Sequence, residues 1–254
     1  MPTATMADFI PPRQLDLFED SRNVILRNDV IAALSQRDAV ACEGAIAVLA
    51  AEYADDLRLP AFRLLCETLR SGLPVPLGRE AAGAIVQNYD DGAVAVAARE
   101  VFGQDAQDWL SPLWEKFAKA IAGYPFDPGC ETLHAAPALL RGGHWDAAMA
   151  CIEGIVSWRR QPAPLAWMIE AKCRIDGVNA IWPLLAELAW MAPPRAQALA
   201  PRLARQELYR LVNCFDGEFE GEGTPEDFAW FPAWALVATG GLAEALRHAE
   251  AGAD

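Results

Sequence analysis

Residues 143–148 read Gly-His-Trp-Asp-Ala-Ala, a glycine followed two positions later by an aromatic residue and three positions after that by an alanine. Glycine suits the turn that ends one helix, and a small alanine lets the next helix approach the first closely. Ile152 and Ile155 follow Ala148 at spacings that place apolar side chains on the inward face of a helix. The stretch therefore predicts two helices packed against each other across a short turn.

The same helical period extends over most of the chain. Leu26, Val30 and Leu34 are spaced to face inward from a helix expected at residues 21–35, and Asp38 is placed to cap the next helix. No window alternates apolar and polar residues with a period of two, so we expect no strands and an all-α protein. Two further inward stripes consist of Cys42, Ala45, Ile46, Leu49 and Tyr53, and of Phe62, Leu65, Cys66, Leu69 and Leu73.

Breaker residues divide this helical chain into parts. Helices are expected at about residues 79–88, 92–102 and 112–122, and the last of them opens with a Ser111 cap followed by proline. The densest cluster of glycine and proline lies at residues 123–129 and predicts a boundary there. We therefore expect an extended N-terminal arm at residues 1–20, an N-terminal helical subdomain at residues 21–123 and a C-terminal helical subdomain at residues 130–254.

The glycine, turn and alanine pattern resembles the tetratricopeptide (TPR) family, whose helix pairs recur every 34 residues. Gly177 follows Gly143 at that interval, whereas Trp182 stands where the family has alanine and residues 75–130 follow no register of the family. The resemblance implies TPR-like antiparallel helix pairs in an α-solenoid, and an irregular helical bundle is the alternative. Grooves between such helices commonly bind peptides or partner helices. A further copy of the pattern consists of Gly240, Leu242 and Ala245.

The charge of the chain limits the classes of partner. It has 35 acidic and 21 basic residues and a net charge of -14, so it lacks the phosphate-neutralising surface that direct nucleic-acid binding needs. The same charge opposes adsorption to anionic membranes. Six scattered cysteines are typical of reduced thiols, and neither a signal peptide nor a membrane-spanning stretch is expected. The sequence predicts a soluble cytoplasmic protein with protein partners and leaves its oligomeric state open.

A second resemblance lies in the N-terminal arm. The peptide Gln-Leu-Asp-Leu-Phe that begins at Gln14 resembles, at all five positions, the motif by which bacterial polymerases and repair factors dock on the DNA sliding clamp. By resemblance, Gln14 would bind polar groups at the rim of the clamp pocket and Leu15 would pack beside it. Leu17 and Phe18 would fill the apolar floor of that pocket, with Asp16 as a tolerated spacer. Alternatively, the apolar residues hold the arm on the helical body or form a hydrophobic staple.

Two other clusters are candidate interaction surfaces. Arg195, Arg202, Arg205 and Arg210 concentrate positive charge, either as a solvated helix face or as a site for an acidic ligand. Four aromatic residues are too densely spaced for a single helix face, so some of them must meet another element. They either close the C-terminal end of the helical stack or form a peptide-binding groove. These aromatic residues are Phe228, Trp230, Phe231 and Trp234.

Signals for catalysis are weak. Cys130 and His134 come nearest to a thiol and imidazole pair, since an i, i+4 spacing places two residues on one helix face, but the residues around Cys130 are typical of a helix start. No acidic or histidine cluster has metal-ligand spacing, and no glycine-rich loop has a phosphate-binding pattern. We therefore expect a non-enzymatic protein-protein interaction scaffold or adaptor without cofactor or metal. A sliding-clamp-binding accessory of DNA replication or repair is one alternative, and an unrecognised enzyme is the other.

Overall fold

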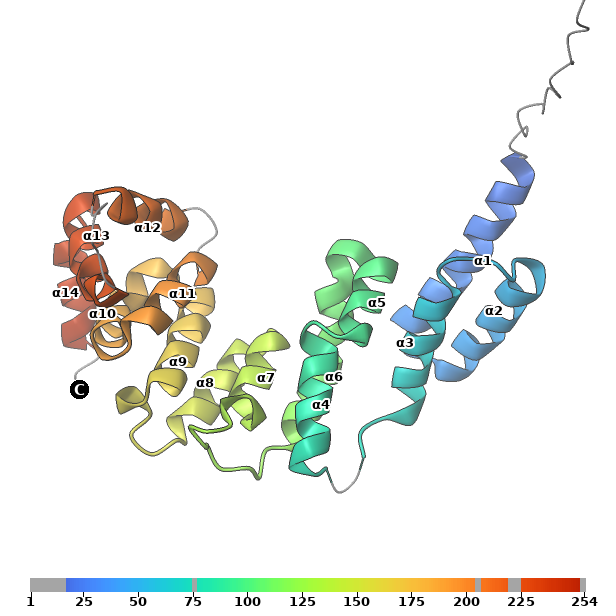
Figure 1. Cartoon of the computed structure of the whole chain (residues 1–254), viewed down its shortest axis with the longest axis horizontal. Helices are drawn as coiled ribbons and strands as arrows, with labels where there is room; N and C mark the ends of the chain where they lie inside the picture. Colours follow the sequence, from blue (N-terminus) through green and yellow to red (C-terminus); the bar gives the residue numbers. More distant parts are fainter. Residues whose placement is uncertain (1–16, 75–76, 204–206, 219–224, 252–254) are drawn as a thin grey trace, which may run out of the picture. The chain divides into compact units, whose positions relative to one another are not determined.

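The computed structural model describes residues 17–74, 77–203, 207–218 and 225–251, and Figure 1 shows them as helices joined by short turns. These residues contain no strand, so the prediction of an all-α protein is confirmed. Within the same ranges, every helix is either too short or too polar to cross a lipid bilayer.

The chain divides into two compact units. The first consists of residues 1–72 and 96–106, and the second of residues 73–95 and 107–254. Residues 123–129, where the sequence predicts a boundary, lie within the second unit. The first unit contains α1 (Leu17–Ser35), α2 (Ala39–Glu52), α3 (Leu59–Ser71) and η1 (Gly103–Asp105). Two helices have residues in both units, α5 (Ala93–Phe102) and α6 (Ala106–Ala120). The second unit contains α4 (Arg79–Asp90), η2 (Glu131–Leu133), α7 (Ala135–Arg141), α8 (Trp145–Glu153), η3 (Trp158–Arg160), α9 (Pro162–Ile175), η4 (Val178–Ile181), α10 (Trp182–Met191), α11 (Pro193–Leu203), α12 (Glu207–Glu218), η5 (Pro225–Trp230), α13 (Phe231–Thr239) and α14 (Leu242–Ala251).

In the first unit, α1 and α2 pack against each other and α3 packs against both. The carboxylate of Asp38 accepts hydrogen bonds from the amides of Val40 and Ala41 at 3.0 and 2.9 Å, which confirms the predicted cap. Of the side chains predicted to face inward, Leu26, Val30, Leu34, Cys42, Ile46, Leu49, Phe62, Leu65 and Cys66 are buried, and Ala45, Tyr53, Leu69 and Leu73 are half-buried.

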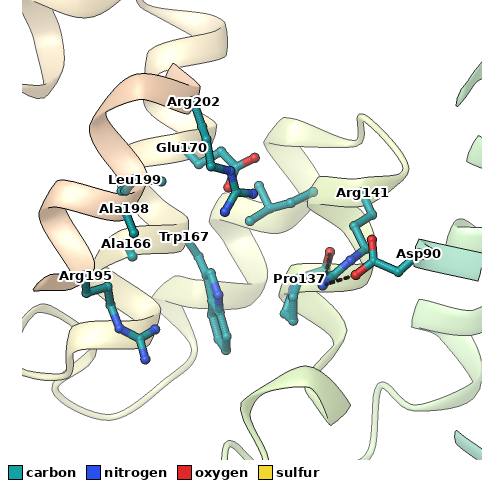
Figure 2. A pocket seen from close by; sticks show the side chains of 11 residues that line it. Asp90, Pro137, Arg141, Ala166, Trp167, Glu170, Arg195, Ala198, Leu199 and Arg202 are labelled. Carbon is teal, nitrogen blue, oxygen red and sulfur yellow. Dashed lines mark hydrogen bonds and ion pairs between the residues drawn. The ribbon is translucent and has the colours of Figure 1, made fainter. Parts of the chain in front are cut away.

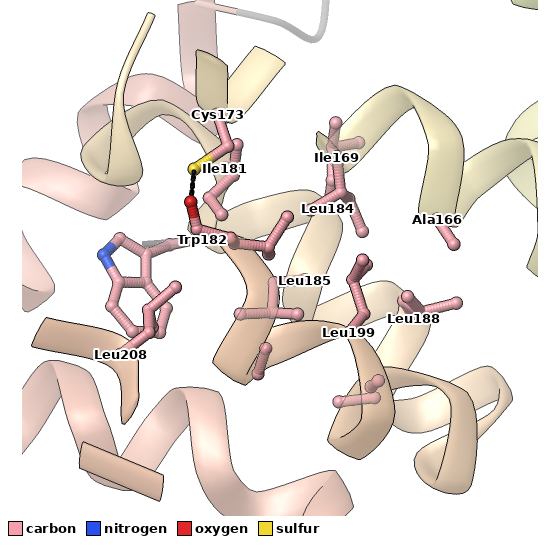
Figure 3. Packing of buried hydrophobic residues seen from close by; sticks show 14 of the residues in the cluster. Ala166, Ile169, Cys173, Ile181, Trp182, Leu184, Leu185, Leu188, Leu199 and Leu208 are labelled. Atoms are coloured by element: carbon pink, nitrogen blue, oxygen red, sulfur yellow. Dashed lines mark hydrogen bonds between the residues drawn. The ribbon is translucent and has the colours of Figure 1, made fainter. Parts of the chain in front are cut away.

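The second unit is built around a large apolar core, part of which Figure 3 shows. Leu185 of α10 has no exposed surface and belongs to one cluster with Ile169 of α9 and Leu199 of α11. Trp182, which stands where the TPR family has alanine, is buried in this core at the start of α10. Its ring lies 6.4 Å from that of Phe231, measured between centroids. The second unit therefore accommodates a large side chain at this position by packing it against α13.

Gly143 and its neighbour Gly142 form the turn between α7 and α8. Gly143 has a φ of 76°, which lies in the left-handed region that favours glycine. A Cβ atom on Gly142 would lie 2.7 Å from Cδ2 of His144, so a side chain at this position would displace that ring. The amide of His144 donates to the carbonyl of Leu139 at 2.9 Å and closes the end of α7. The turn is therefore short because Gly143 adopts a left-handed backbone conformation that few other residues take.

Small side chains hold α8 close to both of its neighbours. Ala148 of α8 has no exposed surface and forms a cluster with Leu140 of α7 and with Ala171 of α9, which is also fully buried. A methyl group at Ala148 lets the backbones approach where a longer side chain would separate them. This contact sets the spacing of α7, α8 and α9.

The start of α6 differs from the prediction. The sequence places it at Pro112, but the helix begins at Ala106 and Pro112 lies inside it. Trp109 and Leu110 are each 5% exposed, so the apolar stripe of the helix extends to the N-terminal side of the proline. Burial of these two side chains outweighs the single backbone hydrogen bond that proline cannot donate.

We predict that Ala148→Leu lowers the free energy of unfolding of the second unit by about 1–3 kcal/mol, because the larger side chain must separate α8 from its neighbours. Tryptophan fluorescence during urea denaturation measures this change, since all nine tryptophans belong to the second unit. Ala147→Leu is the matched control, because Ala147 is an exposed neighbour on the same helix. Equal losses in the two variants would contradict the role given to close packing at Ala148.

Candidate functional site

A pocket of about 380 Å³ opens in the second unit between three alternate helices, α7, α9 and α11 (Figure 2). Asp90, at the end of α4, also lines it. Each of the three helices contributes residues three or four positions apart, which lie on one helix face. The lining consists of Pro137, Leu140 and Arg141 of α7, of Ala166, Trp167 and Glu170 of α9, and of Arg195, Ala198, Leu199 and Arg202 of α11.

The lining combines a buried apolar part with a charged part that reaches solvent. Leu140, Ala166 and Leu199 are buried, whereas Ala198 and Arg202 are exposed. Each helix therefore meets the pocket at the border between its core-facing side and its solvent-facing side. A ligand in this pocket would contact apolar and charged groups together.

Two of the three lining arginines are held in place by carboxylates. Nη2 of Arg141 donates to Asp90 at 2.8 Å, and its guanidinium lies 5.5 Å from the ring centroid of Trp114. Nη1 and Nη2 of Arg195 donate to both carboxylate oxygens of Glu131 at 2.9–3.0 Å. Since a guanidinium has five N–H donors, each arginine keeps donors for a ligand while its own position is fixed.

Two opposite charges in the pocket are not joined to each other. Figure 2 shows Glu170 of α9 and Arg202 of α11 without an ion pair between them. Neither side chain makes an ion pair or hydrogen bond with any residue in the described part of the chain. Glu170 is half-buried and Arg202 is exposed, so both are accessible to a ligand.

The indole of Trp167 is held by two other rings. It stacks on His134 with 5.7 Å between centroids and 8° between planes, and the edge of Phe126 meets it at 5.6 Å. His134 is 7% exposed, and its Nδ1 accepts a hydrogen bond of 3.2 Å from the amide of Ala136, which caps α7. The neutral imidazole therefore carries its proton on Nε2, and burial lowers the pKa of His134 below its ordinary value. Trp167 thus presents a preorganised apolar surface.

Two other hollows are less complete as sites. One of about 410 Å³ lies between α2 and α3, and its lining includes no aromatic residue. Another of about 540 Å³ lies beside His134 and Cys151 and is lined mainly by apolar residues and glycine. The pocket between α7, α9 and α11 unites an aromatic surface, fixed arginines and two unpaired charges, so we take it as the candidate site.

The aromatic cluster predicted as an interaction surface is divided between core and solvent. Phe228 and Phe231 are buried and stack with 4.7 Å between centroids, and both rings meet Phe215 edge-on. Trp234 is half-buried and its Nε1 donates to Glu218 at 2.7 Å. Trp230, in contrast, is 62% exposed.

The other residues singled out by the sequence lie apart from the pocket. Gln14, Leu15 and Asp16 are outside the described residues, and α1 begins at Leu17, so Leu17 and Phe18 are its first two residues. Cys130 immediately precedes η2, whereas His134 caps α7, so the two do not share a helix face. The described residues contain no group of three or more His, Cys, Asp or Glu side chains placed to hold a metal ion.

Two of the lining arginines, Arg195 and Arg202, are recognisable in the sequence as part of a basic cluster, whereas Trp167 and Glu170 carry no such signal. The spacing of the lining residues along the chain is the one sequence signal that could have indicated them. Pro137, Ala166 and Arg195 are equally spaced along the chain, and Arg141, Glu170 and Leu199 are spaced by that same interval. The interval is shorter than the distance from Gly143 to Gly177, on which the TPR register rests. Residues at this interval from three helices line one pocket.

A scan against protein-family models, a search of the curated proteins and a search of the solved structures each find nothing that matches this chain.

We predict that α7 loses protection at its first turn as the pH falls. Protonation turns Nδ1 of His134 from an acceptor into a donor and removes the cap, so this stabilisation is complete above pH 6.5 and is lost as the pH falls through the lowered pKa. Loss of a cap corresponds to about 1 kcal/mol, or about fivefold faster amide exchange. The rate of hydrogen-deuterium exchange of the Ala136 amide measures the loss of the cap.

His134→Asn is the control, because asparagine retains an N-cap acceptor but does not titrate. The ratio of exchange rates, wild type over variant, should rise as the pH falls. A ratio that is independent of pH would show that the imidazole does not govern the cap.

Proposed function

We propose that the chain is a non-enzymatic protein-interaction adaptor with a TPR-like helical body, and that the pocket between α7, α9 and α11 binds a peptide segment of a partner protein. The observation that carries the proposal is the use of alternate helices. α7, α9 and α11 alternate along the chain with α8 and α10, and α9 packs against both α7 and α11. Stacked helix pairs expose one helix of each pair on a shared face, which helical-repeat proteins commonly use for binding.

The equal spacing of lining residues supports the same proposal. Pro137, Ala166 and Arg195 are equally spaced along the chain and line one pocket, as expected if the pocket is formed by a helical repeat. A surface that repeats along a stack suits a ligand that also repeats, and a peptide chain is such a ligand.

The chemistry of the lining suits a peptide. Glu170 supplies an acceptor for a peptide N–H, and Arg202 supplies donors for a carbonyl or a carboxylate. Trp167 offers an apolar surface that is already fixed by His134 and Phe126, so little side-chain freedom is lost when a ligand packs on it.

We predict that peptides selected from a random display library on the full chain bind at this pocket. Ala198→Phe should weaken their binding by about tenfold or more, because an exposed alanine of the pocket wall is replaced by a ring that occupies the space of the ligand. Fluorescence anisotropy of the labelled peptides measures the dissociation constants.

Ala147→Phe, which adds the same ring to an exposed position of α8 outside the pocket, should bind as the wild type does. If no selected peptide is weakened by Ala198→Phe, the pocket is not a peptide site and the proposal fails.

A second candidate function is docking on the bacterial DNA sliding clamp through residues 14–18. It is favoured by the agreement of all five residues with the clamp-binding motif. Since α1 begins at Leu17, docking in an extended form would open the first turn of α1. Helix ends fray at low cost, so this requirement is compatible with binding. The adaptor and clamp functions are compatible, because the motif and the pocket use different residues.

We predict that immobilised bacterial sliding clamp retains the wild-type chain and releases the Leu17→Ala, Phe18→Ala double variant, because both apolar anchors are lost. The Asp16→Ala variant should still be retained by the clamp, since Asp16 is a spacer of the motif and not one of its apolar anchors. Circular dichroism checks that the variants keep their helix content. Equal retention of the wild type and the double variant, or retention of neither, would exclude the clamp as a partner of this motif.

A further inference from the structure

The charges of the pocket are arranged along one stripe of α11. Arg195 and Arg202 are seven residues apart, which is two helical turns, with Ala198 and Leu199 between them. Seven residues correspond to about 10 Å along a helix axis. The two arginines are therefore attached at the ends of a stripe of α11 whose middle consists of Ala198 and Leu199, and Trp167 of α9 lines the same pocket (Figure 2).

The two arginines differ in their present partners. Arg195 is fixed by Glu131 but keeps unused N–H donors, and Arg202 makes no ion pair among the described residues. Exposed arginine in an acidic chain normally has carboxylates nearby to pair with, and Glu170 is the carboxylate of the facing wall. Glu170 remains separate from Arg202, so Arg202 is available to an anionic ligand from outside the chain.

We infer that the ligand of this pocket is an acidic peptide segment of a partner protein, with two carboxylate side chains three residues apart and an apolar residue near them. The inference rests on the proposed function and specifies its ligand. In a polyproline II conformation, residues three apart lie on the same side at about 9 Å, which matches the spacing of Arg195 and Arg202. One carboxylate binds Arg202, the other binds the free donors of Arg195, and the apolar residue packs on Trp167.

The net charge of the chain does not prevent this recognition. The value of -14 acts at long range, where salt screens it beyond about 8 Å at physiological ionic strength. The contacts in the pocket are made at hydrogen-bonding distance, where screening is weak. Glu170 opposes an acidic ligand locally, so it lowers the affinity without abolishing it.

This arrangement predicts opposite effects for two neighbouring substitutions. The probe is a fluorescein-labelled peptide that was selected on the full chain and whose binding Ala198→Phe weakens. Arg202→Gln should weaken its binding about fivefold, the scale of a partly exposed charge pair, and Glu170→Gln should strengthen it by a similar factor. Arg210→Gln is the control, because it removes the same charge from an exposed position of α12 outside the pocket.

The spacing is tested with variants of the same probe. In one variant an acidic residue is moved so that the two acidic residues are two residues apart instead of three, with composition unchanged, and this variant should bind more weakly. Replacing both acidic residues by Gln should weaken binding further.

The outcomes separate the inference from the proposed function. Pocket-dependent peptides that lack acidic residues, or an Arg202→Gln variant that binds as tightly as the wild type, overturn the inference and leave the adaptor function standing. Weaker binding in both Arg202→Gln and Glu170→Gln indicates a ligand with both charges and also overturns it. A selection that yields no peptide weakened by Ala198→Phe overturns the proposed function itself.

Discussion

The close contact of α8 with α7 and α9 is the constraint on which the pocket depends. Ala148 has no exposed surface and belongs to one apolar cluster with Leu140 of α7 and Ala171 of α9. α8 therefore acts as a spacer that brings α7 and α9 to one side of itself, where both line the pocket. The short turn at Gly142 and Gly143 keeps the start of α8 close to the end of α7, which allows this close packing.

The pocket divides its polar groups into fixed and available ones. The ion pairs of Arg141 with Asp90 and of Arg195 with Glu131 orient the walls, and the ordering of those side chains is complete before any ligand arrives. His134 connects this site to the backbone, since the same ring that stacks on Trp167 also caps α7. A change in the charge of His134 therefore alters a helix end and an aromatic surface of the pocket together.

The helices and most of their buried faces could be predicted from the sequence, because a 3.6-residue period of apolar residues is a local signal. Asp38 was recognisable as a cap for the same reason. The start of α6 was predicted wrongly at Pro112, since local proline chemistry indicated a first turn while burial of Trp109 and Leu110 extended the helix beyond it.

The pocket was not predictable in the same way, because its residues meet only when three helices are packed. Arg195 and Arg202 belong to a charge cluster that is visible in the sequence, but nothing local indicated that Glu170 would line the same pocket as Arg202. The resemblance to TPR proteins was read from turn glycines, whose interval differs from that of the lining residues. The spacing of the pocket residues was thus present in the sequence at positions that are not those of the turns.

Ala198 and Arg202 are exposed, so substitutions at these positions can change which ligands the pocket binds. Both residues stand on the wall of the pocket, while the neighbouring Leu199 is committed to the core. Substitutions at the two exposed positions alter what the pocket accepts at little cost in stability, since surface changes usually stay within about 0.5 kcal/mol. A few exchanges at exposed positions of one helix can therefore change the chemistry of the pocket wall, while the buried residues that determine folding stay the same.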